Sequence, residues 1–143
     1  MAYETSPTAC TTRSDTAHRG DYVSVLLVED EPLIRVIMAE TLEDAGFAVI
    51  QAATGDEAIS VINDEMVTIT ALVTDLHMPG ETDGADVALR VRQRWPDMPV
   101  VIASGRPDAM KVSWQEDKGY RLLRKPYLPR QLLGVLKELN LAA

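Results

Sequence analysis

Apolar and polar positions form blocks along this chain, and the blocks switch regularly between two periods. Short runs rich in Val, Ile, Leu and Ala, bounded by Gly, Pro or acidic residues, are typical of buried β-strands. We predict five such strands, at residues 23–28, 47–52, 67–74, 99–103 and 120–124. Between and after them, apolar residues recur at helical spacing, which predicts five helices, at residues 32–46, 54–62, 83–95, 107–117 and 128–139.

Local signals support several of these boundaries. Pro32 suits the first turn of a helix, and Gly46 is a typical residue at a helix C-terminus. Thr54, with Glu57 three residues later, predicts a capping box at the start of the second helix. The outer face of the third helix carries three arginines, which we interpret as solvent-exposed: Arg90, Arg92 and Arg94.

A regular alternation of strands and helices implies right-handed crossovers and a parallel sheet covered by helices on both sides. The predicted fold class is therefore α/β, a flavodoxin-like (βα)5 doubly wound parallel sheet with strand order 2-1-3-4-5. The chain has 143 residues, which suits one domain, predicted at residues 22–140. Residues 1–21 are rich in Thr, Ser and Ala and are expected to form a disordered leader, and we expect no output domain after the last helix.

Composition narrows the function classes. The net charge of -8 disfavours binding to nucleic acid, which needs basic residues, and to an anionic membrane surface. We also expect no membrane segment, because no apolar run reaches transmembrane length. The single cysteine, Cys10, has no partner for an internal disulfide, and this favours a cytoplasmic location.

Polar residues stand where four of the predicted strands end. Glu29 and Asp30 follow the first strand, Asp75 the third, Ser104 the fourth and Lys125 the fifth. In a parallel α/β sheet these ends share one edge, where ligands bind. Clustered carboxylates repel one another unless a cation such as Mg²⁺ neutralises them. A lysine and a hydroxyl beside such a site suit a phosphoryl group, with Asp75 as the nucleophile.

Four segments together resemble the signature of the response-regulator receiver domain, and the resemblance covers about residues 22–139. They are Val28-Glu29-Asp30-Glu31, Thr74-Asp75-Leu76-His77-Met78-Pro79-Gly80, Ala103-Ser104-Gly105 and Lys125-Pro126-Tyr127. The resemblance implies a domain that takes a phosphoryl group onto Asp75 from a phosphohistidine on a sensor histidine kinase or a phosphotransfer protein. It also implies that Mg²⁺ binds Asp30, Asp75 and the backbone carbonyl of His77 directly, and Glu29 through water.

The same resemblance implies that Lys125 pairs with the phosphoryl oxygens and that the hydroxyl of Ser104 swings toward them. That motion would repack the surface of the fourth helix, the fifth strand and the fifth helix for a downstream protein target. Alternatively, the domain would pass the phosphoryl group on. Enzymatic activity would be limited to weak self-phosphotransfer and self-dephosphorylation, and the chain is expected to be a monomer or a weak phosphorylation-dependent dimer.

Several positions depart from the family pattern. Leu122 stands where the family usually has an aromatic residue that responds to the hydroxyl, and the nearby Tyr120 lies two residues earlier. His77 and Arg106, two residues after Asp75 and Ser104, flank the site and could affect the access of water to the phosphoryl group. Trp114 lies on the predicted fourth helix, where it is either packed on the domain or exposed as an anchor for a partner.

Three alternative functions stay open at this point. One is a small Mg²⁺-dependent phosphohydrolase with an aspartate nucleophile, although such enzymes usually carry an acid where His77 stands. A second is a flavin or nucleotide binder, which the acidic Glu29-Asp30-Glu31 run disfavours because it would repel phosphate. The third is the receiver segment of a larger hybrid histidine kinase.

Overall fold

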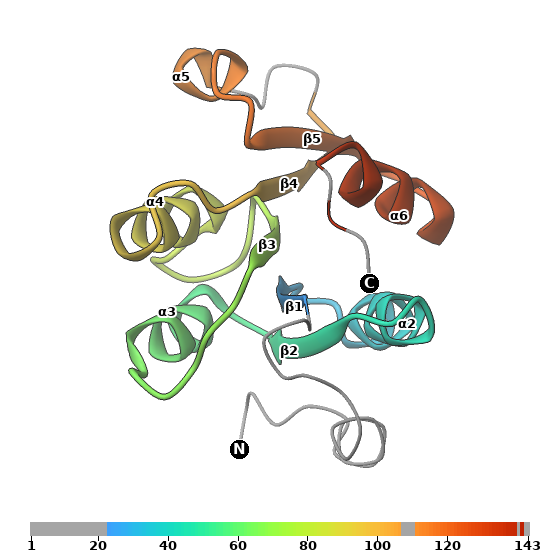
Figure 1. Cartoon of the computed structure of the whole chain (residues 1–143), viewed down its shortest axis with the longest axis horizontal. Coiled ribbons are helices and arrows are strands. Elements are labelled where there is room, and N and C mark those ends of the chain that lie inside the picture. The colour runs from blue at the N-terminus through green and yellow to red at the C-terminus, as the bar shows by residue number, and fades with distance from the viewer. Residues whose placement is uncertain (1–22, 107–110, 140, 142–143) are drawn as a thin grey trace.

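The protein is a five-stranded parallel sheet with helices on both faces (Figure 1). The computed structural model describes residues 23–106, 111–139 and 141. The strands, in sheet order β2-β1-β3-β4-β5, are β2 Ala48–Ala52, β1 Ser24–Val28, β3 Ala71–Asp75, β4 Val100–Ser104 and β5 Tyr120–Arg124. The helices are α2 Pro32–Asp44, α3 Gly55–Asn63, α4 Gly84–Arg94, α5 Val112–Gln115 and α6 Pro129–Glu138. The predicted fold class and strand order are confirmed.

Two apolar layers lie between the sheet and its helices. On one face, side chains of α3, α4 and α5 pack on alternate strand residues such as Leu26, Leu72 and Ile102. On the other, α2 and α6 cover the intervening residues, among them Leu27 and Val101. Because β1, β3 and β4 are covered on both sides, their sequences are continuously apolar rather than alternating. All five strands run the same way, so their C-terminal ends meet at one edge.

Two boundary predictions need substantial correction. The third strand begins at Ala71 and not at 67, because Val67 closes a turn on Asp64 and the side chain of Thr70 bonds to the backbone of Ser24. Helix α5 ends at Gln115, before the predicted 117, since Asp117 leaves the helix to accept hydrogen bonds from Arg92. Its predicted start at Pro107 lies outside the described residues, as do the leader and Cys10.

The capping signals were partly correct. Gly46 adopts a φ of 100°, and Phe47 N–H donates to the carbonyl of Leu42 at 3.0 Å, which closes α2 as predicted. Thr54 Oγ1 accepts from the N–H of Glu57 at 3.0 Å. The Glu57 carboxylate, however, accepts from Ala53 N–H and not from the cap residue, so the predicted box is displaced by one residue.

The interpretation of the α4 arginines as a solvent-exposed face was wrong, because Arg90, Arg92 and Arg94 are all half-buried. Arg94 donates to the carbonyls of Ile62 and Asp64 and so satisfies the C-terminal end of α3. Arg92 donates from Nε to the carbonyl of Met98 at 2.7 Å. The charged side chains of Arg92 and Arg94 therefore stabilise the fold through hydrogen bonds to backbone carbonyls. Within the described part of the chain, no helix has the length and apolar character needed to cross a membrane.

Candidate functional site

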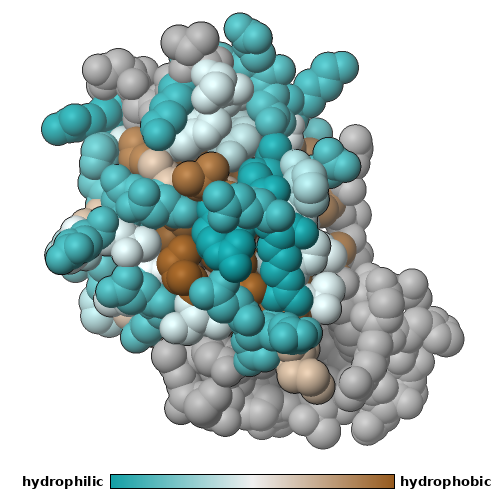
Figure 2. All heavy atoms as spheres, turned by 90° about the vertical axis from the view of Figure 1, so that its left-hand side faces the viewer, coloured by the Kyte–Doolittle hydropathy of each residue, from teal (hydrophilic) through white to brown (hydrophobic). Residues whose placement is uncertain are grey.

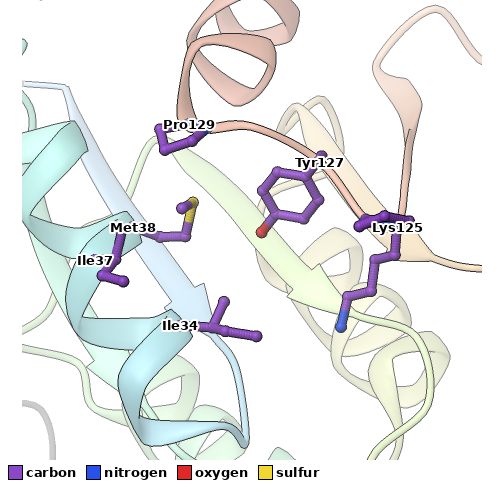
Figure 3. A pocket seen from close by; sticks show the side chains of 7 residues that line it. Ile34, Ile37, Met38, Lys125, Tyr127 and Pro129 are labelled. Carbon is purple, nitrogen blue, oxygen red and sulfur yellow. The ribbon is translucent and has the colours of Figure 1, made fainter.

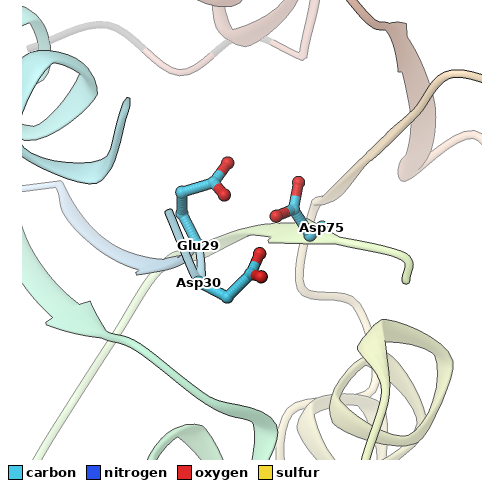
Figure 4. Close-up of side chains that lie close together, drawn as sticks. All are labelled: Glu29, Asp30 and Asp75. Carbon is cyan, nitrogen blue, oxygen red and sulfur yellow. The ribbon is translucent and has the colours of Figure 1, made fainter. Parts of the chain in front are cut away.

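The C-terminal edge of the sheet brings three carboxylates together (Figure 4). In the β1–β3 register Val28 pairs with Thr74, so Glu29 and Asp30 emerge beside Asp75. Each of the three offers a carboxylate oxygen, and these oxygens all lie within 4.8 Å of one another. Glu29 and Asp75 are each only 2% exposed. Buried like charges at this separation need a cation or protons, which makes this edge reactive.

Strands β4 and β5 add the two other predicted groups at the same edge. Asp75 pairs with Ala103, which places Ser104 one residue beyond it. The N–H of Lys125 donates to the carbonyl of Ser104 at 3.0 Å, so the lysine leaves β5 next to the acidic cluster. Its Nζ lies 2.5 Å from Asp75 Oδ1 and 3.7 Å from Glu29 Oε1. All five residues predicted from strand ends therefore meet at one site.

The burial and close approach of these charged groups shift their pKa values. Burial, reinforced by the neighbouring Glu29, raises the pKa of Asp75 to about 8 despite the opposing attraction of Lys125. Burial alone would lower the pKa of Lys125, but its hydrogen bond and attraction to Asp75 outweigh this and raise it. Burial, with the nearby charges of Glu29 and Asp75, raises the pKa of Tyr127 as well.

The carboxylates fit a hard divalent cation. Oδ2 of Asp75 is buried and has no hydrogen-bond partner among the described residues, so it points to a ligand that the chain itself does not supply. Among the described residues, this cluster brings together three carboxylates and no cysteine or histidine, a ligand set that suits Mg²⁺. Glu29, Asp30 and Asp75 would hold the ion. His77 follows the site with an exposed side chain, and the role of its backbone carbonyl stays a prediction.

The remaining predicted positions differ in their relation to the site. Ser104 is 2% exposed, and its Oγ accepts from Arg106 N–H at 3.1 Å. Leu122 is half-buried against the core, so an aliphatic side chain fills the usual aromatic position. Trp114 is 7% exposed and stacks on Tyr120, which supports packing on the domain rather than an exposed anchor.

Sequence reasoning missed the role of Gly84. Its N–H donates to the carbonyl of Leu76 at 2.9 Å, and a Cβ at this position would overlap the backbone carbonyl of Asp75. The glycine thus lets the first turn of α4 lie directly on the strand end that carries Asp75. The Asp-Gly pair at residues 83 and 84 was the available signal, but the aspartate also suits a helix cap, and the structure shows that it serves as one.

The model of the response regulator receiver domain family matches residues 25–137 of the chain. The chain belongs to this family. The receiver signature read from the sequence is thereby confirmed, and with it a place in two-component signalling.

Individual relatives agree with this assignment. The sensor kinase CckA of Brucella abortus (strain 2308) is 32% identical over 117 residues, which make up 81% of this chain and 12% of that kinase. A response regulator receiver protein from Sinorhizobium medicae WSM419 shares 32% identity with a TM-score of 0.72, covering 84% of this chain and 96% of that one. Response regulator TrrA from Thermotoga maritima, solved in complex with Mg²⁺-BeF, shares 25% identity with a TM-score of 0.68, covering 82% and 98%.

The curated relatives are longer than this chain, which spans 12% of CckA and 24% of the transcriptional regulator DctD of Rhizobium meliloti (strain 1021). Receiver domains bind Mg²⁺ at an acidic pocket, and this chain has an acidic cluster formed by Glu29, Asp30 and Asp75. Receiver domains act in general as signalling phosphoacceptors rather than as dedicated enzymes.

Proposed function

We propose that this receiver domain accepts a phosphoryl group on Asp75 from a phosphohistidine of a sensor histidine kinase or a phosphotransfer protein. The observation that carries the proposal is the ion pair of 2.5 Å between Lys125 Nζ and Asp75 Oδ1, next to a buried and unpartnered Oδ2. Lys125 thus pairs with one oxygen of Asp75, and the carboxylate keeps a second oxygen that has no partner among the described residues. The same chemistry would serve a stand-alone protein or the receiver segment of a hybrid kinase.

In the reaction, a carboxylate oxygen of Asp75 forms a bond to phosphorus while the phosphorus–nitrogen bond of the donor breaks. The donor imidazole keeps the electron pair of that bond and takes up a proton, and the product is an acyl phosphate. Lys125 would neutralise charge that develops on the phosphoryl oxygens, and the hydroxyl of Ser104, at the same edge of the sheet, would donate a hydrogen bond to one of them. A bound Mg²⁺ would supply further neutralisation of these oxygens.

The surface beside the site suits a protein donor. A cavity of about 480 Å³ lies between α2 and the β5–α6 connection (Figure 3). It is lined by Ile34, Ile37, Met38, Lys125, Pro126, Tyr127 and Pro129. Leu33, at 72% exposed, and Val36, at 44%, extend this apolar surface along α2. Since Lys125 belongs to both the cavity and the site, we place the histidine-bearing partner here.

We further propose that the phosphorylated domain signals to a downstream protein or passes the group on, as a monomer or a weak phosphorylation-dependent dimer in the cytoplasm. Outside a weak self-phosphotransfer and self-dephosphorylation, it is not an enzyme. The dense acidic site and the net charge of -8 support protein partners over nucleic acid or membrane.

Intact mass after incubation with acetyl phosphate and Mg²⁺ tests the proposal. The native protein is expected to gain one phosphoryl group, and Asp75→Ala none. Asp97→Asn, which removes an exposed carboxylate outside the site, should gain the group as the native protein does. Equal labelling of native protein and Asp75→Ala would mean that another residue is the acceptor. If neither protein is labelled, the site does not accept a phosphoryl group from acetyl phosphate, and the proposal is refuted for this donor.

A further inference from the structure

Helix α5 is fixed to the sheet by a column of four stacked side chains, which we call the aromatic column: Lys111, Trp114, Tyr120 and Arg92. The rings of Trp114 and Tyr120 are nearly parallel, at 11°, with centroids 5.2 Å apart. Nζ of Lys111 lies 5.2 Å from the Trp114 ring, and the guanidinium of Arg92 lies 4.5 Å from the Tyr120 ring. Each ring of the stacked pair therefore also contacts a cation.

The inner end of the column is itself anchored. Arg92 donates to both carboxylate oxygens of Asp117, at 2.8 and 3.2 Å, and to the carbonyl of Met98. Asp117 also accepts from the N–H of Gly119 at 2.8 Å. Bidentate pairing of this kind fixes the planar guanidinium in one orientation. The column thus ties α5 to α4 and to the first residue of β5 at once.

The column lies at the opposite end of β5 from the phosphoacceptor site. Tyr120 pairs with Val100 at the start of β4, whereas Ser104 is the last residue of that strand. The position between them that would carry an aromatic switch is Leu122, paired with Ile102 and half-buried against the core. A half-buried leucine packed against the core lacks the planar ring whose rotation would transmit a motion of Ser104 toward α5.

We propose that the aromatic column keeps α5 in one position whether or not Asp75 carries a phosphoryl group, so that partners read the phosphoryl group at the C-terminal edge of the sheet and not at α5. This inference rests on the proposed phosphoacceptor function. The chemistry of α5 agrees with it, because Trp114 is buried and the exposed side chains beside it, Ser113, Gln115 and Glu116, are polar. The face formed by α3, α4 and α5 is mostly hydrophilic, with some hydrophobic residues exposed near its centre (Figure 2).

Fluorescence of Trp114 tests the proposal directly. The chain has two tryptophans, so Trp95→Phe leaves Trp114 as the single reporter. In this background we expect the emission maximum and the quenching by iodide to be the same without ligand and with Mg²⁺ plus beryllofluoride, a stand-in for the phosphoryl group. A shift in emission or a change in quenching on adding beryllofluoride would overturn the proposal.

A second variant tests the column without any ligand. Tyr120→Leu in the same background removes the inner ring, and we expect Trp114 to become at least about twofold more accessible to iodide. Phe47→Leu, which removes a buried ring from the opposite apolar layer, should leave the quenching of Trp114 unchanged. Unchanged quenching in Tyr120→Leu would show that the column does not hold α5 and would overturn the proposal.

The melting temperature separates the two proposals. Beryllofluoride with Mg²⁺ should raise it in the Trp95→Phe background if the phosphoacceptor site binds as proposed. No rise in melting temperature would count against the proposed function, and the comparison of Tyr120→Leu with Phe47→Leu would still decide whether the column fixes α5.

Discussion

The cost of keeping Asp75 ionised in the metal-free fold can be measured with Asp75→Asn. Folding raises the pKa of this carboxyl from 3.8 to about 8. At pH 7 the carboxyl of Asp75 is therefore mostly protonated in the folded protein and ionised in the unfolded chain. Three units separate pH 7 from the ordinary pKa, and each is worth about 1.4 kcal/mol, so ionisation costs the fold up to about 4 kcal/mol. Asparagine keeps the shape of the side chain without the charge.

We therefore expect Asp75→Asn to raise the free energy of unfolding of the metal-free protein by about 2–4 kcal/mol at pH 7. The sign depends on pH. A raised pKa in the folded state contributes stability below the ordinary value, and this contribution is lost as pH rises from about 4 to about 8. The difference between variant and native protein should therefore be small near pH 4 and grow toward pH 8.

Loss of the ion pair with Lys125 acts in the opposite direction. The side chain of Lys125 is 33% exposed and keeps Glu29 at 3.7 Å, so water and one carboxylate still stabilise its charge after the substitution. The relief of crowding among the carboxylates is therefore expected to exceed the loss of the pair.

Urea denaturation at a series of pH values, with and without Mg²⁺, is the assay. Saturating Mg²⁺ should stabilise the native protein more than Asp75→Asn, because the variant lacks one of the three carboxylate ligands. Asp97→Asn controls for the change in net charge and should shift stability by less than about 0.5 kcal/mol. If metal-free Asp75→Asn is less stable than the native protein at pH 7, attraction to Lys125 dominates the site and the reasoning fails.

Three further predictions concern other parts of the molecule. Asp30→Asn should weaken Mg²⁺ binding at least about tenfold in a calorimetric titration, because the variant lacks one of the three carboxylates expected to bind the ion. Arg92 lowers the pKa of Asp117, so their pair stabilises the fold above the ordinary carboxyl pKa and the contribution is lost as pH falls through the lowered value. Asp117→Asn should accordingly lower stability by at most about 1 kcal/mol at pH 7 and by less at acid pH, followed by thermal melting. Gly84→Ala should destabilise by about 3 kcal/mol in urea denaturation, whereas Gly134→Ala, in open space on α6, should stabilise by about 0.5–1 kcal/mol.

The fold and the acidic site were predictable because each rests on local patterns. Five apolar runs predict the strands, four of them end in polar residues, and parallel strand ends converge wherever such a sheet forms. Glu29, Asp75 and Lys125 could be assigned to one site on this basis alone, and the register of β1, β3 and β4 places them there.

Contacts between distant segments could not be predicted in the same way. Nothing near Arg92 in the sequence indicates that its partner is Asp117, which is 25 residues away. An arginine on a helix face has the same local pattern whether it faces water or the exposed carbonyls of a neighbouring helix, as Arg94 does. The close approach of Gly84 to the Asp75 carbonyl likewise depends on how α4 packs against β3. The local sequence does not determine that packing.

The two ends of strand β5 have different roles: residues at its start pack α5 onto the sheet, and Lys125 after its end belongs to the acidic site. At its start, Tyr120 is buried between Trp114 and Arg92, and each charge in that group has a partner. Directly after its end, Lys125 faces carboxylates whose combined charge exceeds its own, so the local charge favours binding of a cation. Substitutions at Tyr120 should therefore change stability and the position of α5 while leaving phosphorylation of Asp75 intact, whereas substitutions at Lys125 should do the reverse. Since Leu122, between the two ends, has no aromatic ring and is only partly buried against the core, we expect the two ends of the strand to respond independently.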